Sequence, residues 1–190
     1  MANFADSRRG IELIIYELSS EECHQFLINT GFGRLGCCRD KQPYVVPIYF
    51  ASDKKHLYGF TSPGKKVSWM RFNPLVSVES DEVIDSSNWK SVIVSGRFQE
   101  LKVEGSLANV REYALELLQR RVMWWQPASA SSQRRNSGSK FSPILYRIRI
   151  DEITGQGCRP DSLEEATGKT RVYRVIGEDK REQALRAKRN

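Results

Sequence analysis

Six segments of the chain have the two-residue apolar period or the apolar composition of β-strands, and polar turns bound them. They span residues 32–38, 44–51, 56–61, 75–79, 89–103 and 143–150. The connection at 52–55 is short enough for antiparallel pairing, whereas parallel pairing needs a crossover of about a dozen residues. The sequence therefore predicts a mainly β (α+β) fold, a closed or sandwich-like antiparallel barrel with helices at its ends.

Few helices are predicted between these strands. They span about 20–29, 65–72 and 106–123. Ser19 and Glu22 have capping-box spacing before the first helix, and Gly31 ends it. The second helix must stop before Pro74, and Ser106 is the expected N-cap of the third. We expect these helices to lie at the periphery of the barrel.

The 190 residues are enough for one domain with peripheral segments. We expect an N-terminal leader over 1–17, a domain over 18–155 with a flexible serine-rich loop at 127–140, and a basic tail over 156–190. Residues 169–190 hold eight Lys or Arg against three Asp or Glu, so most of the net charge of +7 lies there. A solvated terminus explains this tail, and nucleic acid is not an expected partner.

Composition also restricts the compartment and the metal chemistry. No apolar run approaches the roughly 20 residues that cross a bilayer, and the first residues lack the apolar region of a secretory signal. We therefore expect a cytoplasmic protein with no membrane attachment. The four cysteines form no CxxC pair and there are only two histidines, so free thiols and no metal site are predicted.

Residues 58–66 carry the clearest chemical signal. A predicted strand ends at the hydroxyls of Thr61 and Ser62, a glycine turn follows, and Lys65 and Lys66 open a helix. Hydroxyls, backbone donors, the positive end of a helix and ammonium groups together suit a phosphate. A solvated turn with two surface lysines is the alternative. A P-loop needs Ser or Thr where Lys66 stands, so a phosphate monoester bound without a metal is predicted.

Several motifs in a fixed order then resemble a known family. They lie at 33–36, 42–50, 58–66, 71–78 and 89–97. Over about residues 19–150 the chain resembles the pyridoxamine 5'-phosphate oxidase-like split-barrel flavoproteins, especially their nitroimidazole-resistance branch. The resemblance implies a six-stranded antiparallel split β-barrel and a homodimer with a flavin mononucleotide (FMN) site at the subunit interface. It also implies an oxidoreductase that acts on a small organic molecule.

The resemblance implies flavin contacts for ten residues and names no catalytic residue. Thr61, Ser62, Lys65 and Lys66 would hold the phosphate and ribityl chain, Tyr44, Val45, Val46 and Phe60 would line the isoalloxazine ring, and Ser91 with Trp89 would make a polar contact to it. For Val45 and Val46, ordinary packing in the barrel is the alternative.

Departures from the family narrow the implied chemistry. Pro43 and Ile48 stand where true pyridoxamine-phosphate oxidases carry basic residues, and their arginine-containing C-terminal substrate segment is not found, so oxidation of vitamin B6 is not predicted. The histidine of the nitroimidazole-resistance branch has no equivalent at 60–61. A deazaflavin-dependent reductase, a haem-binding split barrel, and a protein that stores or senses flavin without turnover stay open as alternatives.

Overall fold

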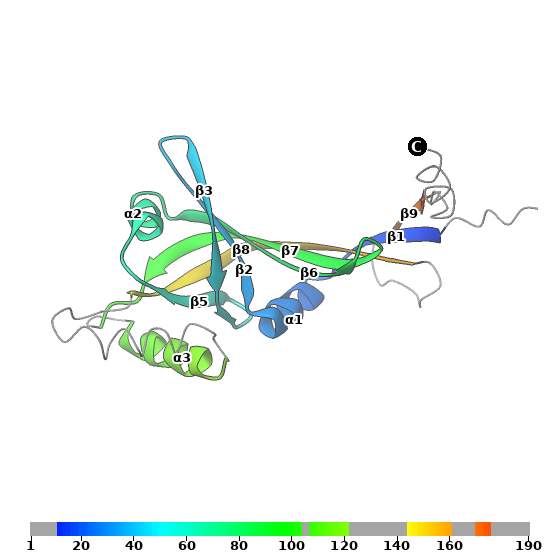
Figure 1. Ribbon diagram of the computed structural model, residues 1–190. Coiled ribbons are helices and arrows are strands. Elements are labelled where there is room, and N and C mark those ends of the chain that lie inside the picture. The colour runs from blue at the N-terminus through cyan, green and yellow to red at the C-terminus, as the bar shows by residue number, and fades with distance from the viewer. Residues whose placement is uncertain (1–10, 104–106, 122–143, 161–169, 176–190) are drawn as a thin grey trace, which may run out of the picture.

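The computed structural model describes residues 11–103, 107–121, 144–160 and 170–175. Within these ranges it has nine strands in one antiparallel sheet and three helices (Figure 1). The elements are β1 (Ile11–Glu17), α1 (Ser20–Thr30), β2 (Phe32–Arg39), β3 (Gln42–Tyr49), β4 (Ala51–Ser52), β5 (His56–Thr61), α2 (Lys65–Phe72), β6 (Leu75–Asp85), β7 (Asn88–Glu100), α3 (Ala108–Gln119), β8 (Ile144–Pro160) and β9 (Thr170–Val175).

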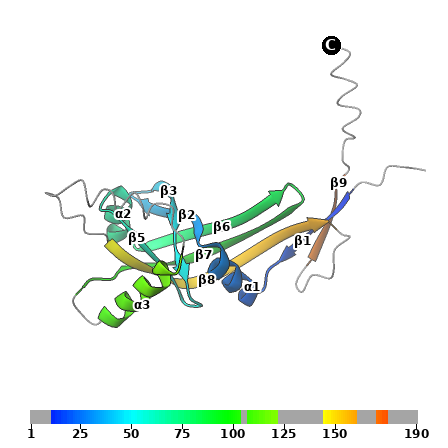
Figure 2. The same cartoon turned by 60° about the horizontal axis from the view of Figure 1, so that its bottom comes forward.

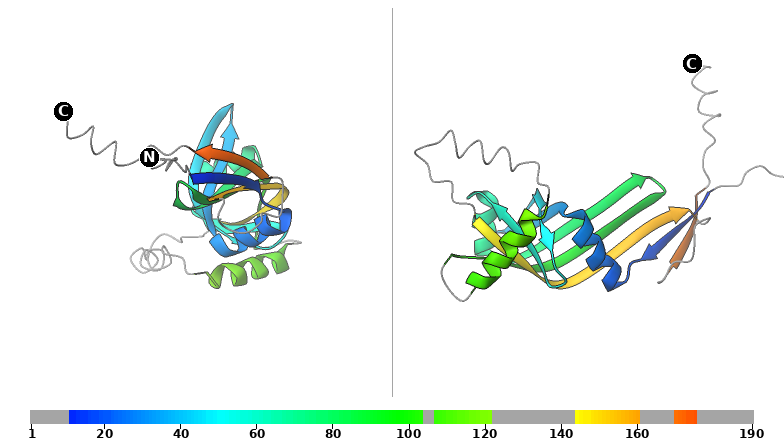
Figure 3. Two further views of the ribbon diagram at one scale, coloured as in Figure 1. Left: turned by 90° about the vertical axis from the view of Figure 1, so that its right-hand side faces the viewer. Right: turned by 90° about the horizontal axis from the view of Figure 1, so that it is seen from below.

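The strands curve round a common interior. Their order is β3-β2-β6-β7-β8-β1-β9, and β5 pairs with both β8 and β4. Only Phe50 separates β3 from β4. Strand β3 pairs with β2, and β4, directly after it, pairs with β5. Seen along the long axis, these strands surround the barrel interior (Figure 3, left).

The barrel interior is apolar. Side chains from β2, β6, β7 and β8 fill it, among them the fully buried Leu35, Val78, Val92, Val94 and Ile148. Tyr146 joins them because its partner on β5 is Gly59, where a Cβ atom would lie 2.6 Å from the tyrosine hydroxyl. A second buried cluster packs α3 against β4 and β5, and it consists of Ala51, Tyr58, Leu101, Ala114, Leu118 and Leu145.

Local signals in the sequence predicted the first two helices correctly. The capping box is present, since the Glu22 backbone N–H donates to Ser19 Oγ at 3.3 Å and the Ser19 backbone N–H donates to the Glu22 carboxylate at 2.7 Å. Gly31 ends α1 in the left-handed conformation. Helix α2 has the predicted bounds. The third helix is described over Ala108–Gln119, and its expected cap Ser106 lies outside the described residues.

The mainly β split-barrel class is confirmed, but the described sheet has nine strands where six were predicted. Residues 11–17, assigned to a leader, form β1, and β9 and the short β4 are also additional. Strand β8 was predicted to end at 150 but continues to Pro160, pairing with β7 as far as Cys158 and with β1 beyond the barrel (Figure 2). These pairings are between distant segments, so no local pattern reports them. The expected loop at 127–140 lies outside the described residues.

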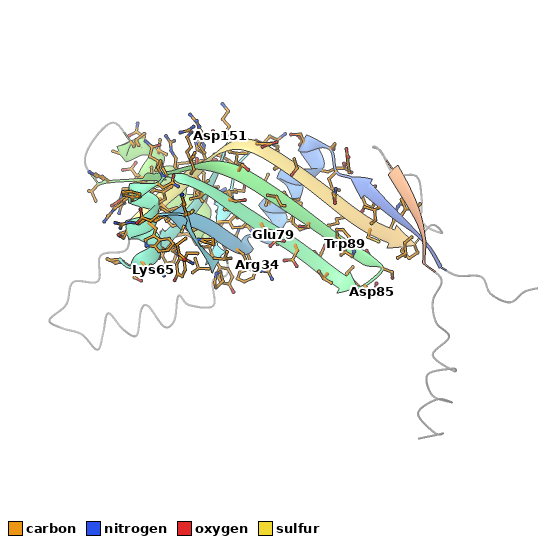
Figure 4. The ribbon with its side chains drawn as sticks, turned by 90° about the horizontal axis from the view of Figure 1, so that it is seen from above. Arg34, Lys65, Glu79, Asp85, Trp89 and Asp151 are labelled. Atoms are coloured by element: carbon orange, nitrogen blue, oxygen red, sulfur yellow. The ribbon has the colours of Figure 1, made fainter. Side chains whose placement is uncertain are left out.

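No described helix combines the length and hydropathy needed to span a membrane. The outer face of β2, β6, β7 and β8 also lacks a covering helix among the described residues, and Figure 4 looks onto this face. That face carries the candidate site.

Candidate functional site

The start of α2 has the properties of an anion-binding position. Its N-cap Gly64 supplies no capping side chain, so no side chain satisfies the first backbone N–H groups of the helix. Thr61 ends β5 just before it, and Ser62 and Lys65 are exposed beside it. Helix N–H groups, the positive end of the helix dipole and two hydroxyls thus converge on one short segment.

The Lys65 ammonium lies against two aromatic rings. Its Nζ is 4.6 Å from the centre of the Tyr44 ring and 4.5 Å from that of Trp69, and the two rings are 5.5 Å apart. This is cation–π geometry, and it holds the charge at a fixed place beside the helix start. The sequence analysis missed Trp69, although it is four residues after Lys65 and therefore lies on the same helix face.

Lys66 is half-buried beneath this position, near the Cys37 thiol of β2. Burial lowers the pKa of Lys66, because a charged ammonium is costly where water is scarce. Burial also raises the pKa of Cys37, and the nearby charges of Lys66 and Lys65 only partly oppose that shift. Lys66 is thus a poorly hydrated cation, which an anion at the start of α2 would stabilise.

The predicted ring-lining residues divide between the surface and the core. Val45 is 64 % exposed and, with Tyr44, lines a shallow depression of about 460 Å³ on the outer face. Val46 points the other way and packs against the main core, and Phe60 packs against the cluster under α3. Tyr44 alternates with Val45 and also packs against the main core, although it lines the edge of the same depression, so Val45 alone of these four exposes its side chain on the outer face.

Trp89 and Ser91 line a different and larger cavity. It has a volume of about 660 Å³, within the range of small-molecule sites, and is formed by Glu17, Leu18, Trp89, Ser91, Ile93, Ile153, Thr154, Gly155 and Gln156. Ser91 Oγ donates to the Glu79 carboxylate at 3.2 Å, and Arg34 pairs with both Glu79 and Asp81. We call this cavity the Trp89 pocket. The lining residues that β1 and β8 contribute were not predicted, because these strands are far from Trp89 in the sequence and only strand pairing brings them beside it.

One chain does not bring all the predicted flavin contacts together. Figure 4 shows Lys65 near one end of the sheet and Trp89 towards the other, with Arg34 and Glu79 between them. Two separate groups of candidate residues therefore exist, one at the start of α2 and one in the Trp89 pocket.

The surface between the two groups includes the shallow depression beside Val45. Strand register puts Gly36 of β2 beside Ser77 of β6, and Ser77 beside Ser95 of β7, so small side chains cross the sheet here. Around them the outer face exposes three apolar side chains, Val45, Leu75 and Ile93, at 64 %, 52 % and 46 %. An exposed patch of small and apolar residues is typical of a protein–protein contact.

Two further observations concern metals and thiols. No group of His, Cys, Asp and Glu side chains in the described ranges is arranged to hold a metal ion. All four cysteines of the chain fall in these ranges, and all four are free thiols.

Comparison with known proteins gives consistent matches over the barrel. Residues 19–157 match the sequence model of a family described as pyridoxamine 5'-phosphate oxidase. An uncharacterized protein of Rhizobium meliloti is 37% identical over 146 residues, which is 77% of this chain and 97% of that protein.

Solved structures match a similar share of the chain. An FAD-binding protein from Mesorhizobium loti is 37% identical with a TM-score of 0.62, covering 77% of this chain and 98% of its own. A candidate pyridoxamine 5'-phosphate oxidase from Corynebacterium glutamicum is 25% identical with a TM-score of 0.56, covering 80% of this chain and 96% of its own. Strands β1 and β9 lie outside the 19–157 match.

Proposed function

The chain belongs to the pyridoxamine 5'-phosphate oxidase family, and on that premise we propose that it is a homodimeric, FMN-binding oxidoreductase acting on a small organic molecule. The observation that carries this proposal is that Lys65 and the Trp89 pocket lie towards opposite ends of the sheet in one chain. If this face packs against the same face of a second copy, a two-fold axis brings the α2 end of each chain to the Trp89 pocket of the other. The exposed Val45, Leu75 and Ile93 supply the apolar contact.

Each group of residues then has a distinct task. The first turn of α2, with Thr61, Ser62, Lys65 and Lys66, binds the phosphate and ribityl chain. Tyr44 and Val45 contact the isoalloxazine ring from one chain, with Val46 and Phe60 packed behind them, and the Trp89 and Ser91 side chains contact it from the second copy. A bound flavin supplies hydride or electron transfer, and the protein orients its ring and excludes water.

The donor set at α2 fits FMN in chemistry and in charge. A phosphate monoester needs several N–H donors and one or two cations without a metal, which is what the uncapped helix start and the two lysines offer. Free thiols at all four cysteines accord with a reducing, cytoplasmic location. Nucleic acid and membranes have no part in this proposal.

The decisive experiment is complementation between two defective variants. Lys65→Ala removes a phosphate contact from one half-site, and Trp89→Ala removes a ring contact from the other. Each variant alone should bind FMN weakly, while an equimolar mixture after subunit exchange should regain tight binding at about a quarter of its sites, since half the dimers then hold one intact site. Size-exclusion chromatography and circular dichroism verify that both variants are folded dimers.

A mixture that binds no better than the average of its parents would contradict the shared site. A monomeric wild-type protein that binds FMN tightly would contradict the dimer.

FAD is the second candidate cofactor, because the Mesorhizobium loti structure is that of an FAD-binding protein at 37% identity. An absorption spectrum of the purified protein should show flavin bands near about 375 and 450 nm, and chromatography of the released cofactor distinguishes FMN from FAD. A single band near about 420 nm would indicate deazaflavin or haem instead. A colourless protein that takes up neither FMN nor FAD would overturn the flavin proposal.

A further inference from the structure

The Trp89 pocket has one wall that the family match does not include. The match begins at residue 19, whereas Glu17 and Leu18 line the pocket from the end of β1. Glu17 is exposed and, among the residues that line this pocket, is the one charged side chain. Its carboxylate is therefore placed to set the charge preference of the pocket.

The position of Glu17 is fixed by β8. Glu17 pairs with Gln156 in the strand register, and the backbone N–H of Leu18 donates to the Gly155 carbonyl at 2.9 Å. The preceding Tyr16 lies over Gly157, where a Cβ atom would come within 2.5 Å of the tyrosine ring. The glycine thus leaves room for Tyr16, and the end of β1 is held at the pocket.

The surroundings of the pocket add negative charge. Strand register aligns Asp81, Ser91, Gln156 and Glu17 in one row across four strands. Next to this row Ser91 donates to Glu79, and Arg34 is shared between Glu79 and Asp81. Lys90, between Trp89 and Ser91 in the sequence, lines the adjoining depression with Asp81 and not the Trp89 pocket. The Arg34 guanidinium is thus paired with two carboxylates, and Glu17 is left as the charged side chain that lines the pocket itself, so the pocket wall is acidic.

We propose that Glu17 is a specificity-determining residue and that the Trp89 pocket takes an aromatic cation, such as a benzylic amine, in preference to an aromatic anion. The Trp89 ring provides a flat apolar contact for an aromatic group, and Glu17 attracts the positive charge. That this ligand is the substrate of the flavin rests on the function proposed above. The phosphate is bound at α2, so the two ends of the site select opposite charges.

The test compares benzylamine with benzoate, which share a ring and differ in charge. Calorimetric titration of the full-length, FMN-loaded protein should show benzylamine binding at least about fivefold more tightly than benzoate. Glu17→Gln should weaken benzylamine binding about fivefold and leave benzoate binding equal or tighter, since two charges about 4 Å apart in water interact by about 1 kcal/mol. Glu152→Gln is the matched control, because Glu152 is an exposed carboxylate of β8 that does not line the pocket.

Flavin content, measured by absorbance in the same samples, separates this inference from the proposed function. With FMN retained, three results overturn the role of Glu17 and leave the flavoprotein proposal intact. They are a wild-type protein that does not bind benzylamine, a wild-type protein that binds benzoate at least as tightly as benzylamine, and a Glu17→Gln variant whose preference is unchanged. Absence of FMN overturns the flavoprotein proposal, while the same titration of the flavin-free protein still decides the role of Glu17.

Discussion

The two ends of the outer face differ in charge and in how the chain builds them. The α2 end is cationic and comes mainly from one contiguous segment, 61–69, which is joined by Tyr44 and Val45 of β3. The Trp89 pocket is acidic and comes from β1, β7 and β8, which are far apart in sequence (Figure 3, right). A helix start can thus form an anion site almost alone, whereas a pocket on a sheet requires every strand to be in register.

The largest expected effect distinguishes the two ends, because each is proposed to bind a different part of the cofactor. Lys65→Ala should weaken FMN binding by about tenfold to a hundredfold, because a charge-assisted contact to phosphate contributes about 1.5–3 kcal/mol. Riboflavin, which has no phosphate, should bind this variant as it binds the wild type. Trp89→Ala should weaken both ligands equally. Quenching of flavin fluorescence measures all four affinities.

Lys102→Ala is the control for this comparison, since Lys102 is exposed and lies outside both groups of residues. Equal losses of FMN and riboflavin affinity in Lys65→Ala would show that Lys65 does not contact the phosphate.

A smaller effect tests how β1 is held at the acidic end. Gly157→Ala places a Cβ atom against the Tyr16 ring and should lower the free energy of unfolding by about 1–3 kcal/mol. In a Tyr16→Ala background the same change should cost much less, because the ring is gone. Urea unfolding of the four proteins measures this coupling. Additive losses would mean that Tyr16 does not occupy the space over Gly157.

The smallest expected effect concerns the buried charge at the cationic end. The pKa of Lys66 is lower in the folded protein than its ordinary 10.5, so the unfolded chain binds that proton more tightly. The charge therefore destabilises the fold at neutral pH, and this cost disappears as the pH rises to 10.5. Lys66→Met should be at least as stable as the wild type near about pH 7, with the difference shifting in favour of the wild type near about pH 10.

Urea unfolding at both pH values checks this prediction, with Lys102→Met as the exposed control. A Lys66→Met protein that is less stable by the same amount at both pH values would contradict it. The variant should still bind FMN more weakly, so that stability and cofactor affinity change in opposite directions at this residue.

Much of the barrel was predictable because its signals are local. The capping box at Ser19 and Glu22, the stop before Pro74 and the two-residue period of the strands depend on neighbours in sequence. The grouping of hydroxyls, glycine and lysines at the start of α2 was predictable for the same reason, since these residues are adjacent; that the group binds a phosphate stays a prediction. Trp69 could have been added from its four-residue spacing to Lys65.

The acidic half-site was only partly predictable. Trp89 and Ser91 were named from the family resemblance, and the match over 19–157 confirms that resemblance. The contribution of Glu17 could not be predicted, because it depends on pairing with Gln156, nearly 140 residues away. That pairing exists because β8 continues past the barrel and offers its edge to β1.

The sequence by itself therefore determined the fold class, the helices, the family and the grouping of hydroxyls and lysines at the α2 segment, from which a phosphate site is predicted. The tertiary structure decided that β1 and β9 extend the sheet, that Lys65 and Trp89 lie towards opposite ends of it, and that a carboxylate lies at the Trp89 pocket. The physical reason is the range of the interactions. Capping and periodicity act within a few residues, whereas strand pairing satisfies backbone hydrogen bonds between distant segments whose own sequences do not name their partner.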